Sequence, residues 1–132
     1  MIKKNDSIAI ALLDQAISSD PIRAAFYNNR GWVHQLQANY DLAKKDFDAA
    51  VRFDSTNVRY WHNPIRILLI QKNVPKGLEL CNNAILKFPE DGYAYFVRSS
   101  LLREFVKNEK LANSDLKKAH ELGWAKGFYF VY

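Results

Sequence analysis

The amino-acid sequence predicts an all-α fold: a right-handed superhelix (α-solenoid) of about three and a half helix–turn–helix repeats with a short aromatic C-terminal tail. The first supporting observation is that bulky and small residues alternate along residues 26–50, on two helical faces separated by the polar residues 37–39. The second is that this pattern recurs, because Tyr27, Trp61 and Tyr95 lie 34 residues apart. A helix pair this short cannot bury its own apolar face, so its copies are expected to stack into a continuous core.

The period also runs through columns of small and large residues. The alanine column has spacings of 34, 34 and 35, so the third copy carries one extra residue, which we place in a loop between Phe105 and Lys110. The columns are Ala16, Ala50, Ala84 and Ala119; Ala9, Ala43, Gly77 and Ala112; Leu13, Phe47, Cys81 and Leu116; and Pro21, Ser55 and Pro89. Small residues let two backbones approach and large ones fill the gap, so these columns predict closely packed antiparallel helices.

The repeated unit resembles the tetratricopeptide repeat (TPR), a helix–turn–helix of 34 residues. The resemblance covers residues 9–122 and rests on the aromatic near the start of the first helix together with Gly31, Tyr40, Ala43, Phe47, Ala50 and a closing proline such as Pro89. No copy matches fully: His34 replaces an aromatic residue, Ser55 the proline, Ile65 the glycine and Gly77 an alanine. Such a resemblance implies a fold and says less about function.

The first elements are a half repeat and a complete repeat. Residues 1–20 are expected to contain one helix, capped by Asp6 or Ser7 and ending near Ser18, which corresponds to the second helix of a repeat. Repeat one is expected at residues 21–56, with helices at about 21–37 and 40–53. Proline is tolerated in the first turn of a helix, so Pro21 is placed there.

Two further repeats and the tail complete a single predicted domain of residues 1–132. Repeat two, residues 57–90, has helices at about 57–72 and from the turn at 73–75 to about 87, and Pro64 predicts a kink or a restart with Asn63 as cap. Ile65 replaces a small residue, so this pair is expected to pack less regularly. Repeat three, residues 91–123, has helices at about 92–106 and 111–122, and residues 124–132 form a capping tail.

Composition limits the class of protein. A chain of 132 residues with 48% apolar and 14% aromatic residues is long and apolar enough for one folded unit. The 19 basic and 14 acidic residues give a net charge of +5, which favours acidic partners but is modest beside the charge of dedicated nucleic-acid binders. The alternative explanation of this charge is a set of solvated, lysine-rich helix faces.

The cysteine count and the hydropathy pattern favour a cytoplasmic protein. The single cysteine, Cys81, cannot form an internal disulfide and shares a column with Leu13 and Phe47, so it is expected in the core. The apolar run at residues 8–13 is too short for a signal peptide and belongs to a repeat. No run reaches the roughly 18 apolar residues that span a membrane.

A candidate binding groove follows from the repeat geometry. In stacked helix pairs the first helices line the concave surface, where residues one period apart stand side by side. This predicts three rows, with Asn29, Arg59 and Asn63 bordering them: Asn28, His62 and Phe96; Trp32, Arg66 and Ser100; Gln35, Leu69 and Arg103. Aromatic, amide and arginine side chains suit a peptide or partner surface that carries carboxylates.

One specialised function is implied by the resemblance. Some TPR domains hold the C-terminal carboxylate of heat-shock chaperones with an asparagine and paired basic residues on successive first helices. Asn29 and Arg59 are placed like two of these residues. Asn63 stands where the second basic residue belongs, so the clamp is incomplete.

Other functional classes find less support in the sequence. His34, His62 and His120 form no cluster with other ligand types, and one cysteine cannot build a zinc site, so no metal, cofactor or catalysis is expected. Nucleic-acid binding by Trp32 and Phe96 is disfavoured because the basic residues are spread over all surfaces. The first alternative is a structural or self-assembling segment of a larger repeat array, with self-association through residues 128–132, and the second is a nucleic-acid-binding helical repeat. The leading prediction is a non-catalytic protein-interaction module.

Overall fold

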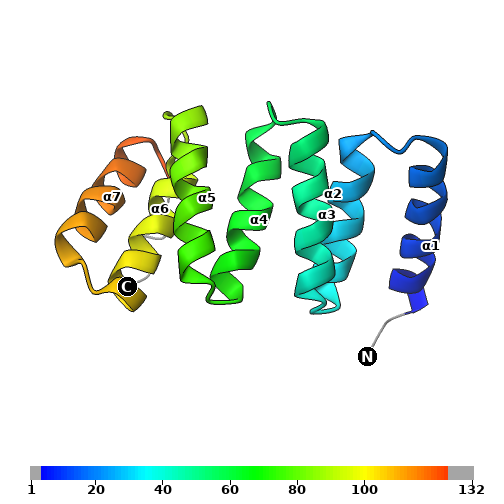
Figure 1. The fold of residues 1–132 in the computed structure, drawn as a ribbon, viewed down its shortest axis with the longest axis horizontal. Coiled ribbons are helices and arrows are strands. Elements are labelled where there is room, and N and C mark those ends of the chain that lie inside the picture. The colour runs from blue at the N-terminus through cyan, green and yellow to red at the C-terminus, as the bar shows by residue number, and fades with distance from the viewer. Residues whose placement is uncertain (1–3, 125–132) are drawn as a thin grey trace. The chain divides into compact units, whose positions relative to one another are not determined.

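Over residues 4–124, the part of the chain that the structure describes, the computed structural model consists of α-helices, one of them extended by a π-helical turn, and contains no strand (Figure 1). The all-α prediction is confirmed. The predicted role of residues 128–132 lies outside the described residues. The elements are α1 Lys4–Ser19, α2 Ala24–Leu36, α3 Tyr40–Phe53, α4 Val58–Ile70, α5 Val74–Lys87, α6 Gly92–Leu101, η1 Leu102–Val106 and α7 Glu109–Glu121.

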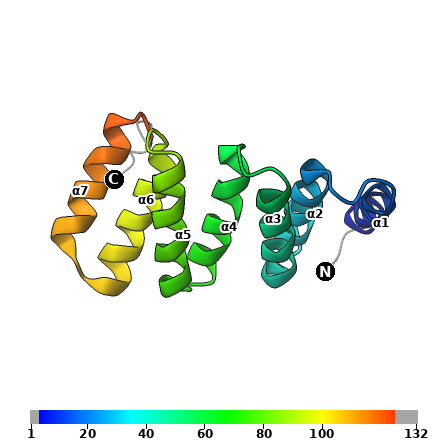
Figure 2. The same cartoon turned by 45° about the horizontal axis from the view of Figure 1, so that its top comes forward.

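The chain divides into two compact units, Met1–Ile67 and Leu68–Tyr132, and the division falls inside α4. In the first unit, α2 packs against α1 on one side and α3 on the other (Figures 1 and 2). Ala43, Phe47 and Ile67 form a fully buried cluster with Tyr40 packed against it. In the second unit, α6 packs against both α5 and α7 around the buried Cys81 and Leu101.

Gly31 explains how closely α2 approaches α3. It is buried, and a Cβ built at this position would lie 2.7 Å from two ring atoms of Phe47. Phe47 is itself fully buried. The predicted pairing of a small residue on one helix with a large one on the next is therefore confirmed at this position.

Gly31→Ala is expected to destabilise the protein by about 1–3 kcal/mol, because the ring of Phe47 has no room to move away. The matched variant is Gly77→Ala, where the added methyl would meet the flexible tip of Leu101 at 2.9 Å. Urea unfolding followed by circular dichroism measures both. Equal effects at the two positions would show that the packing around Phe47 yields as readily as a leucine side chain.

The predicted position of Pro21 is wrong. Pro21 lies in the turn between α1 and α2, and α2 begins three residues later, at Ala24. This turn is closed by Asp20, whose carboxylate accepts a hydrogen bond from Arg23 Nε at 2.9 Å. The Pro21 carbonyl also accepts one from the Tyr27 hydroxyl at 2.6 Å. These local bonds hold Pro21 outside the helix.

The predicted helix restart at Pro64 is also wrong. Helix α4 continues from Val58 to Ile70 with Pro64 inside it. The side chain of Asn63, proposed as a cap, instead bonds to Asn28 and Arg66. The predicted kink and the less regular packing of the second helix pair stay predictions.

The same turn follows the first helix of each complete repeat. A residue with a φ of 55° to 62° precedes an asparagine in all three copies, at Ala38-Asn39, Lys72-Asn73 and Lys107-Asn108. The asparagine N–H donates to the carbonyl five residues earlier in the first two copies, and to the carbonyl six residues earlier, that of Leu102, in the third. The extra residue of the third copy therefore lies before this turn.

This bonding corrects the predicted position of the insertion. The extra residue is accommodated inside the helix, as the π-helical turn η1 at Leu102–Val106, rather than in a loop between Phe105 and Lys110. A π turn absorbs one residue because its hydrogen bonds span five residues instead of four. Residues after Leu101 are thereby shifted relative to their equivalents in the other repeats.

Ala38→Gly is expected to raise the free energy of unfolding by about 0.5–1 kcal/mol. The φ of 59° at Ala38 belongs to the left-handed region, where a Cβ costs about 1 kcal/mol and glycine is preferred. Gln37→Gly is the control, since its φ of −87° offers no such gain. Chemical denaturation that showed the two variants to be equally stable would contradict the prediction.

Cys81 is fully buried, as predicted, and burial raises the pKa of its thiol to about 12, so the thiol stays protonated at neutral pH.

Among the described helices, none has both the length and the apolar character that crossing a membrane requires.

Candidate functional site

Five of the predicted groove residues come together on α2 and α4 of the first unit, and we call them the Trp32–Arg66 surface: Asn28, Trp32, Gln35, Asn63 and Arg66. At its centre the Arg66 guanidinium lies 4.3 Å from the centroid of the Trp32 ring. Beneath both is the buried Phe47, whose ring meets that of Trp32 edge to face at 5.9 Å. Trp32 is nevertheless 39% exposed. An aromatic ring and a cation are thus fixed to the core while the ring still reaches solvent.

The amide side chains form a hydrogen-bonded chain around Arg66. Arg66 donates to Gln35 Oε1 from Nη2 at 2.7 Å and from Nε at 3.2 Å, and to Asn63 Oδ1 from Nη1 at 3.0 Å. Asn63 Nδ2 in turn donates to Asn28 Oδ1 at 2.6 Å. Asn63 is only 5% exposed, so it supports its neighbours from inside.

Helical spacing explains why these residues meet. Asn28, Trp32 and Gln35 are separated by four and three residues and therefore share one face of α2. Asn63 and Arg66 are three residues apart on α4. The hydrogen bonds between the two helices join residues 31 and 35 positions apart, close to the repeat period.

The other candidate residues of the first unit lie around this surface. Asn29 and Arg59 are exposed, and neither side chain is hydrogen-bonded to another residue of the described chain. His62 is half-buried on α4. The two residues resembling part of a carboxylate clamp are therefore accessible, whereas Asn63, at the clamp's next position, is turned inward.

The candidate residues of the second unit make different contacts. Phe96 packs against Trp124 with ring centroids 6.1 Å apart, and the Ser100 hydroxyl donates to the Phe96 carbonyl at 3.3 Å. Arg103, in the π turn, donates to Asn113 at 2.5 Å and lies 3.6 Å from Glu109. Its side chain therefore engages the region of α7. The predicted rows join residues of both units, and their continuity stays a prediction.

Each unit also contains a partly buried ion-pair network that was not predicted from the sequence. In the first unit, Arg30 donates to both oxygens of Asp46 at 2.8 Å and to Asp14 at 2.9 Å. Asp46 is 4% exposed. Its hydrogen bonds raise the pKa of Arg30 above the ordinary value. The arginine thereby connects α1, α2 and α3.

In the second unit the same network recurs. Arg98 donates to both oxygens of Asp115 at 2.7 Å and to Asn82 at 2.8 Å, and these bonds to Asp115 raise the pKa of Arg98. The signal was present in the sequence, because Arg98 stands two periods of 34 after Arg30. These networks join helices within a unit, so we assign them to stability.

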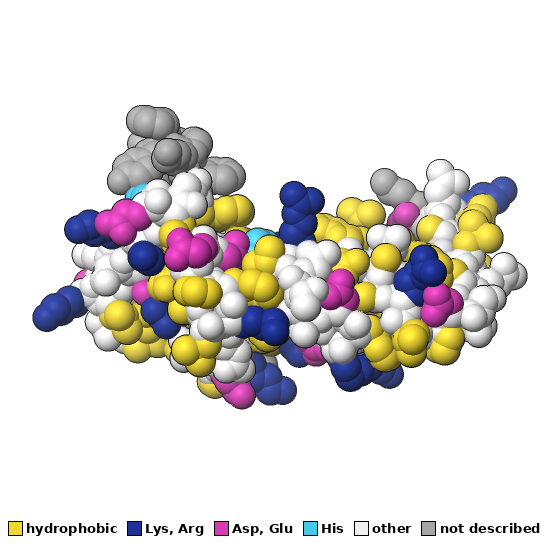
Figure 3. All heavy atoms as spheres, turned by 90° about the horizontal axis from the view of Figure 1, so that it is seen from above, with side chains coloured by type: hydrophobic (Ala, Val, Ile, Leu, Met, Phe, Trp, Pro, Cys, Tyr) yellow, Lys and Arg dark blue, Asp and Glu magenta, His cyan; other side chains and the backbone are white. Residues whose placement is uncertain are grey.

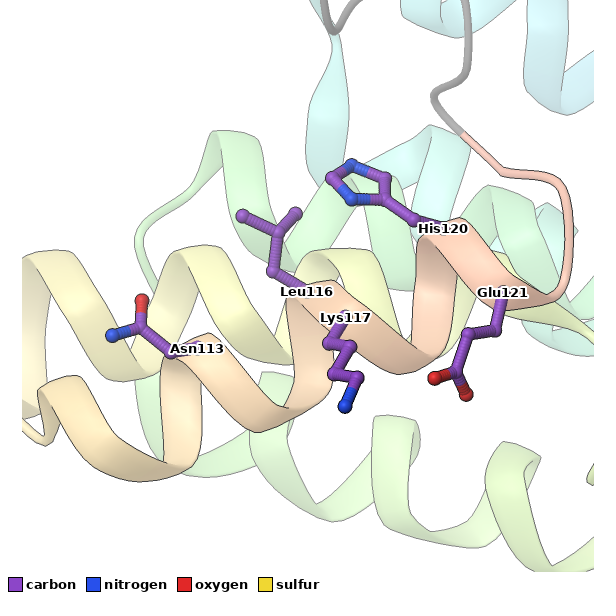
Figure 4. Close-up of a pocket in the computed structure, with 5 residues that line it drawn as sticks. All are labelled: Asn113, Leu116, Lys117, His120 and Glu121. Atoms are coloured by element: carbon purple, nitrogen blue, oxygen red, sulfur yellow. The ribbon is translucent and has the colours of Figure 1, made fainter.

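Two surface hollows lie outside the Trp32–Arg66 surface. One, of about 270 Å³, lies beside the Arg30 network and is bordered by Ile10 and Leu42. The other, of about 460 Å³, runs along one side of α7, where Figure 4 shows Leu116 between polar residues of the same helix. Within residues 4–124, no three His, Cys, Asp or Glu side chains gather to hold a metal ion.

The charges on the face seen in Figure 3 are mixed, with basic and acidic side chains interspersed in each unit. A single basic stripe of the kind that follows a nucleic-acid backbone is not visible on that face. The Trp32–Arg66 surface therefore remains the best-organised candidate among the described residues.

Comparisons with known proteins support the fold. No protein-family model and no curated protein matches the sequence. Among solved structures, the chain is similar to a crystal structure of MamA, with a TM-score of 0.81 at 18% identity. The match covers 94% of this chain and 72% of the MamA chain. YrrB, described as a TPR protein with an unusual peptide-binding site, gives 0.72 at 25% identity, covering 95% and 65%.

Yeast Tom70 is a third match, with a TM-score of 0.68 at 26% identity over 86% of this chain, which spans only 23% of Tom70. These similarities agree with the helix order and with the small and large residues that pack the first helix pair. The chain therefore has the tetratricopeptide-repeat fold, a repeat fold whose stacked helices provide binding surfaces for other proteins.

Proposed function

We propose that the protein is a non-catalytic interaction module that binds an acidic peptide or an acidic partner surface at the Trp32–Arg66 surface. The observation that carries this proposal is the stack of Trp32 on Arg66. Tryptophan and arginine dominate the energetics of protein interfaces, and a tryptophan left 39% exposed over a buried core residue offers apolar area to a partner.

The charge of the chain supports an acidic partner. The net charge is +5, and Arg59 is exposed on α4, the helix that carries Arg66. Long-range attraction of this kind speeds the encounter with an acidic chain. The likeness to YrrB, a TPR protein with a peptide-binding site, supports a peptide as one form of partner.

The chemistry of the surface supports binding without catalysis. Its polar groups are amides and a guanidinium. Amides do not titrate near neutral pH, and arginine keeps its proton, so neither group serves as a general base or a nucleophile there. Such groups orient a ligand by hydrogen bonds.

Trp32→Ala tests the proposal. Twelve-residue peptides are first selected from a random library on the wild-type protein, and the tightest peptide serves as the probe. We expect Trp32→Ala to raise its dissociation constant by about tenfold or more, as loss of a central tryptophan does at interfaces. Leu86→Ala, which truncates a side chain that is 82% exposed on α5, is the control and should leave the affinity unchanged.

The outcome is read by fluorescence anisotropy of the labelled peptide. The proposal would be supported if the selected peptides are enriched in Asp and Glu and if the Trp32→Ala variant binds the probe peptide more weakly than the wild type does. A library that yields no binder, or equal affinity for the wild type and the Trp32 variant, would refute it.

A further inference from the structure

Arg66 fixes the orientation of the amides at the Trp32–Arg66 surface. A guanidinium carries only N–H donors, so any group bonded to it must present an acceptor. Gln35 therefore turns Oε1 toward Arg66, where two N–H groups meet it at 2.7 and 3.2 Å. Asn63 likewise turns Oδ1 toward Arg66, which leaves its Nδ2 to act as the donor on the other side.

The same order of hydrogen-bond donors and acceptors extends from Asn63 to Asn28. Asn63 Nδ2 donates to Asn28, so Asn28 must present Oδ1 to it, at 2.6 Å. The NH₂ groups of Asn28 and Gln35 then point away from this chain of bonds. Neither group bonds to another residue of the described chain, and neither belongs to the buried polar atoms left without a partner, so both reach solvent.

The two outward NH₂ groups are spaced along one face of α2. Asn28 and Gln35 are seven residues apart, which corresponds to a rise of about 10.5 Å in a helix. Trp32 lies between them, and its indole also carries a donor and no acceptor. Along this line the surface thus offers donors on either side of an aromatic ring.

We infer that the surface recognises hydrogen-bond acceptors, namely carbonyl or carboxylate oxygens of an extended peptide, through the NH₂ groups of Asn28 and Gln35. Arg66 is the positioning residue that holds these donors outward. In a polyproline II peptide, carbonyls three residues apart point the same way about 9 Å apart, close to the spacing on α2. This inference rests on the proposed function and specifies the chemistry of its partner.

Isosteric substitutions separate the inward acceptors from the outward donors. Asn28→Asp and Gln35→Glu keep the oxygens that Asn63 and Arg66 require, but they replace each outward NH₂ group by an oxygen. We expect the thermal midpoint to be kept or raised, while the dissociation constant of the selected peptide rises by about tenfold or more, as when a donor bond is replaced by repulsion between acceptors.

Gln15→Glu is the matched control. Gln15 is exposed on α1 of the same unit, outside the predicted groove and the bonded chain, so this variant introduces the same charge without removing a positioned donor. Its effect on the dissociation constant measures the contribution of charge alone, and we expect it to stay within about threefold, as for an exposed charge.

Arg66→Lys tests the positioning role. Lysine keeps the charge but lacks the planar fork that holds Gln35 and Asn63 together. We expect weaker peptide binding, and the side-chain NH₂ resonances of Asn28 and Gln35 in ¹⁵N spectra of the free protein should shift toward those of freely rotating amides. Resonances that remain as in the wild type would overturn the positioning role.

The source of the acceptors is distinguished with a neutral probe, in which every Asp and Glu of the selected peptide becomes Ala, which has no side-chain acceptor. If this probe still binds the wild type and still loses affinity in Gln35→Glu, the acceptors belong to the main chain. If the neutral probe no longer binds, they belong to side-chain carboxylates.

Failure of the inference is distinguishable from failure of the proposed function. A peptide that depends on Trp32 but binds the Asn28→Asp and Gln35→Glu variants as tightly as the Gln15→Glu control would overturn the donor assignment and leave the interaction function standing. The absence of any selected peptide would refute the proposed function and the inference together.

Discussion

Arg98→Met is expected to lower the free energy of unfolding by about 3–5 kcal/mol, the effect of removing one partner of a buried ion pair. Asp115 is 3% exposed, and both of its oxygens accept hydrogen bonds from Arg98. Without the guanidinium, a carboxylate would be left in a site from which water is excluded. Guanidinium chloride titration followed by circular dichroism measures the loss as a lower transition midpoint.

The double variant Arg98→Met/Asp115→Leu separates this penalty from lost packing. Well-packed apolar residues often replace a buried ion pair without loss of stability, so the double variant should recover most of what the single variant loses. The chain contains its own precedent, because the equivalent positions of the second repeat hold Pro64 and Leu80. A double variant as unstable as Arg98→Met would show that the arginine stabilises α6 through contacts other than Asp115.

The ion-pair networks were not predicted from the sequence, and the reason is physical. Charged residues on helices of a repeat are usually solvated, and on that rule Arg30 and Asp46 belong to polar faces. The network also involves a third helix, since Asp14 of α1 also bonds Arg30. Arg98 follows Arg30 after two periods, and this recurrence could have indicated the network. The middle repeat has Pro64 instead of an arginine at the equivalent position, so the recurrence is not visible from one repeat to the next.

Most helices of the fold were predictable because packing columns repeat more strictly than local signals. The predicted bounds 40–53 of the second helix of repeat one match α3, Tyr40–Phe53. The errors lie where a local bond decides the backbone. Asp20 holds Pro21 in a turn, and the extra residue of repeat three became the π turn Leu102–Val106.

The sequence predicted which residues form the candidate site, but it did not predict how their amide side chains are oriented. The period brings Trp32 beside Arg66 and Asn28 near Asn63, and the structure places these four with Gln35 on neighbouring helices. Which atom of each amide faces outward depends on the donors of Arg66, a property that no spacing rule contains. Only the side-chain hydrogen bonds fix that direction.

Pro64→Ala is expected to raise the free energy of unfolding by about 1–2 kcal/mol. Proline inside a helix lacks the N–H that would bond to the carbonyl four residues earlier, and its ring crowds that carbonyl, at a cost of about 3 kcal/mol. Pro64 lies inside the continuous helix α4 and is fully buried. Loss of the packed ring offsets part of the gain, at about 0.8 kcal/mol for each buried methylene.

Pro75→Ala is the matched control, because Pro75 lies in the first turn of α5, where no intrahelical bond is lost. Pro75→Ala should change the free energy of unfolding by less than about 1 kcal/mol, since only the entropy of the unfolded chain changes. Hydrogen exchange adds a local measure: the restored amide at position 64 should be protected if it bonds to Tyr60. A destabilised Pro64→Ala variant would mean that packing of the buried ring outweighs the missing backbone bond, and that α4 is held at this point by its neighbours more than by its own hydrogen bonds.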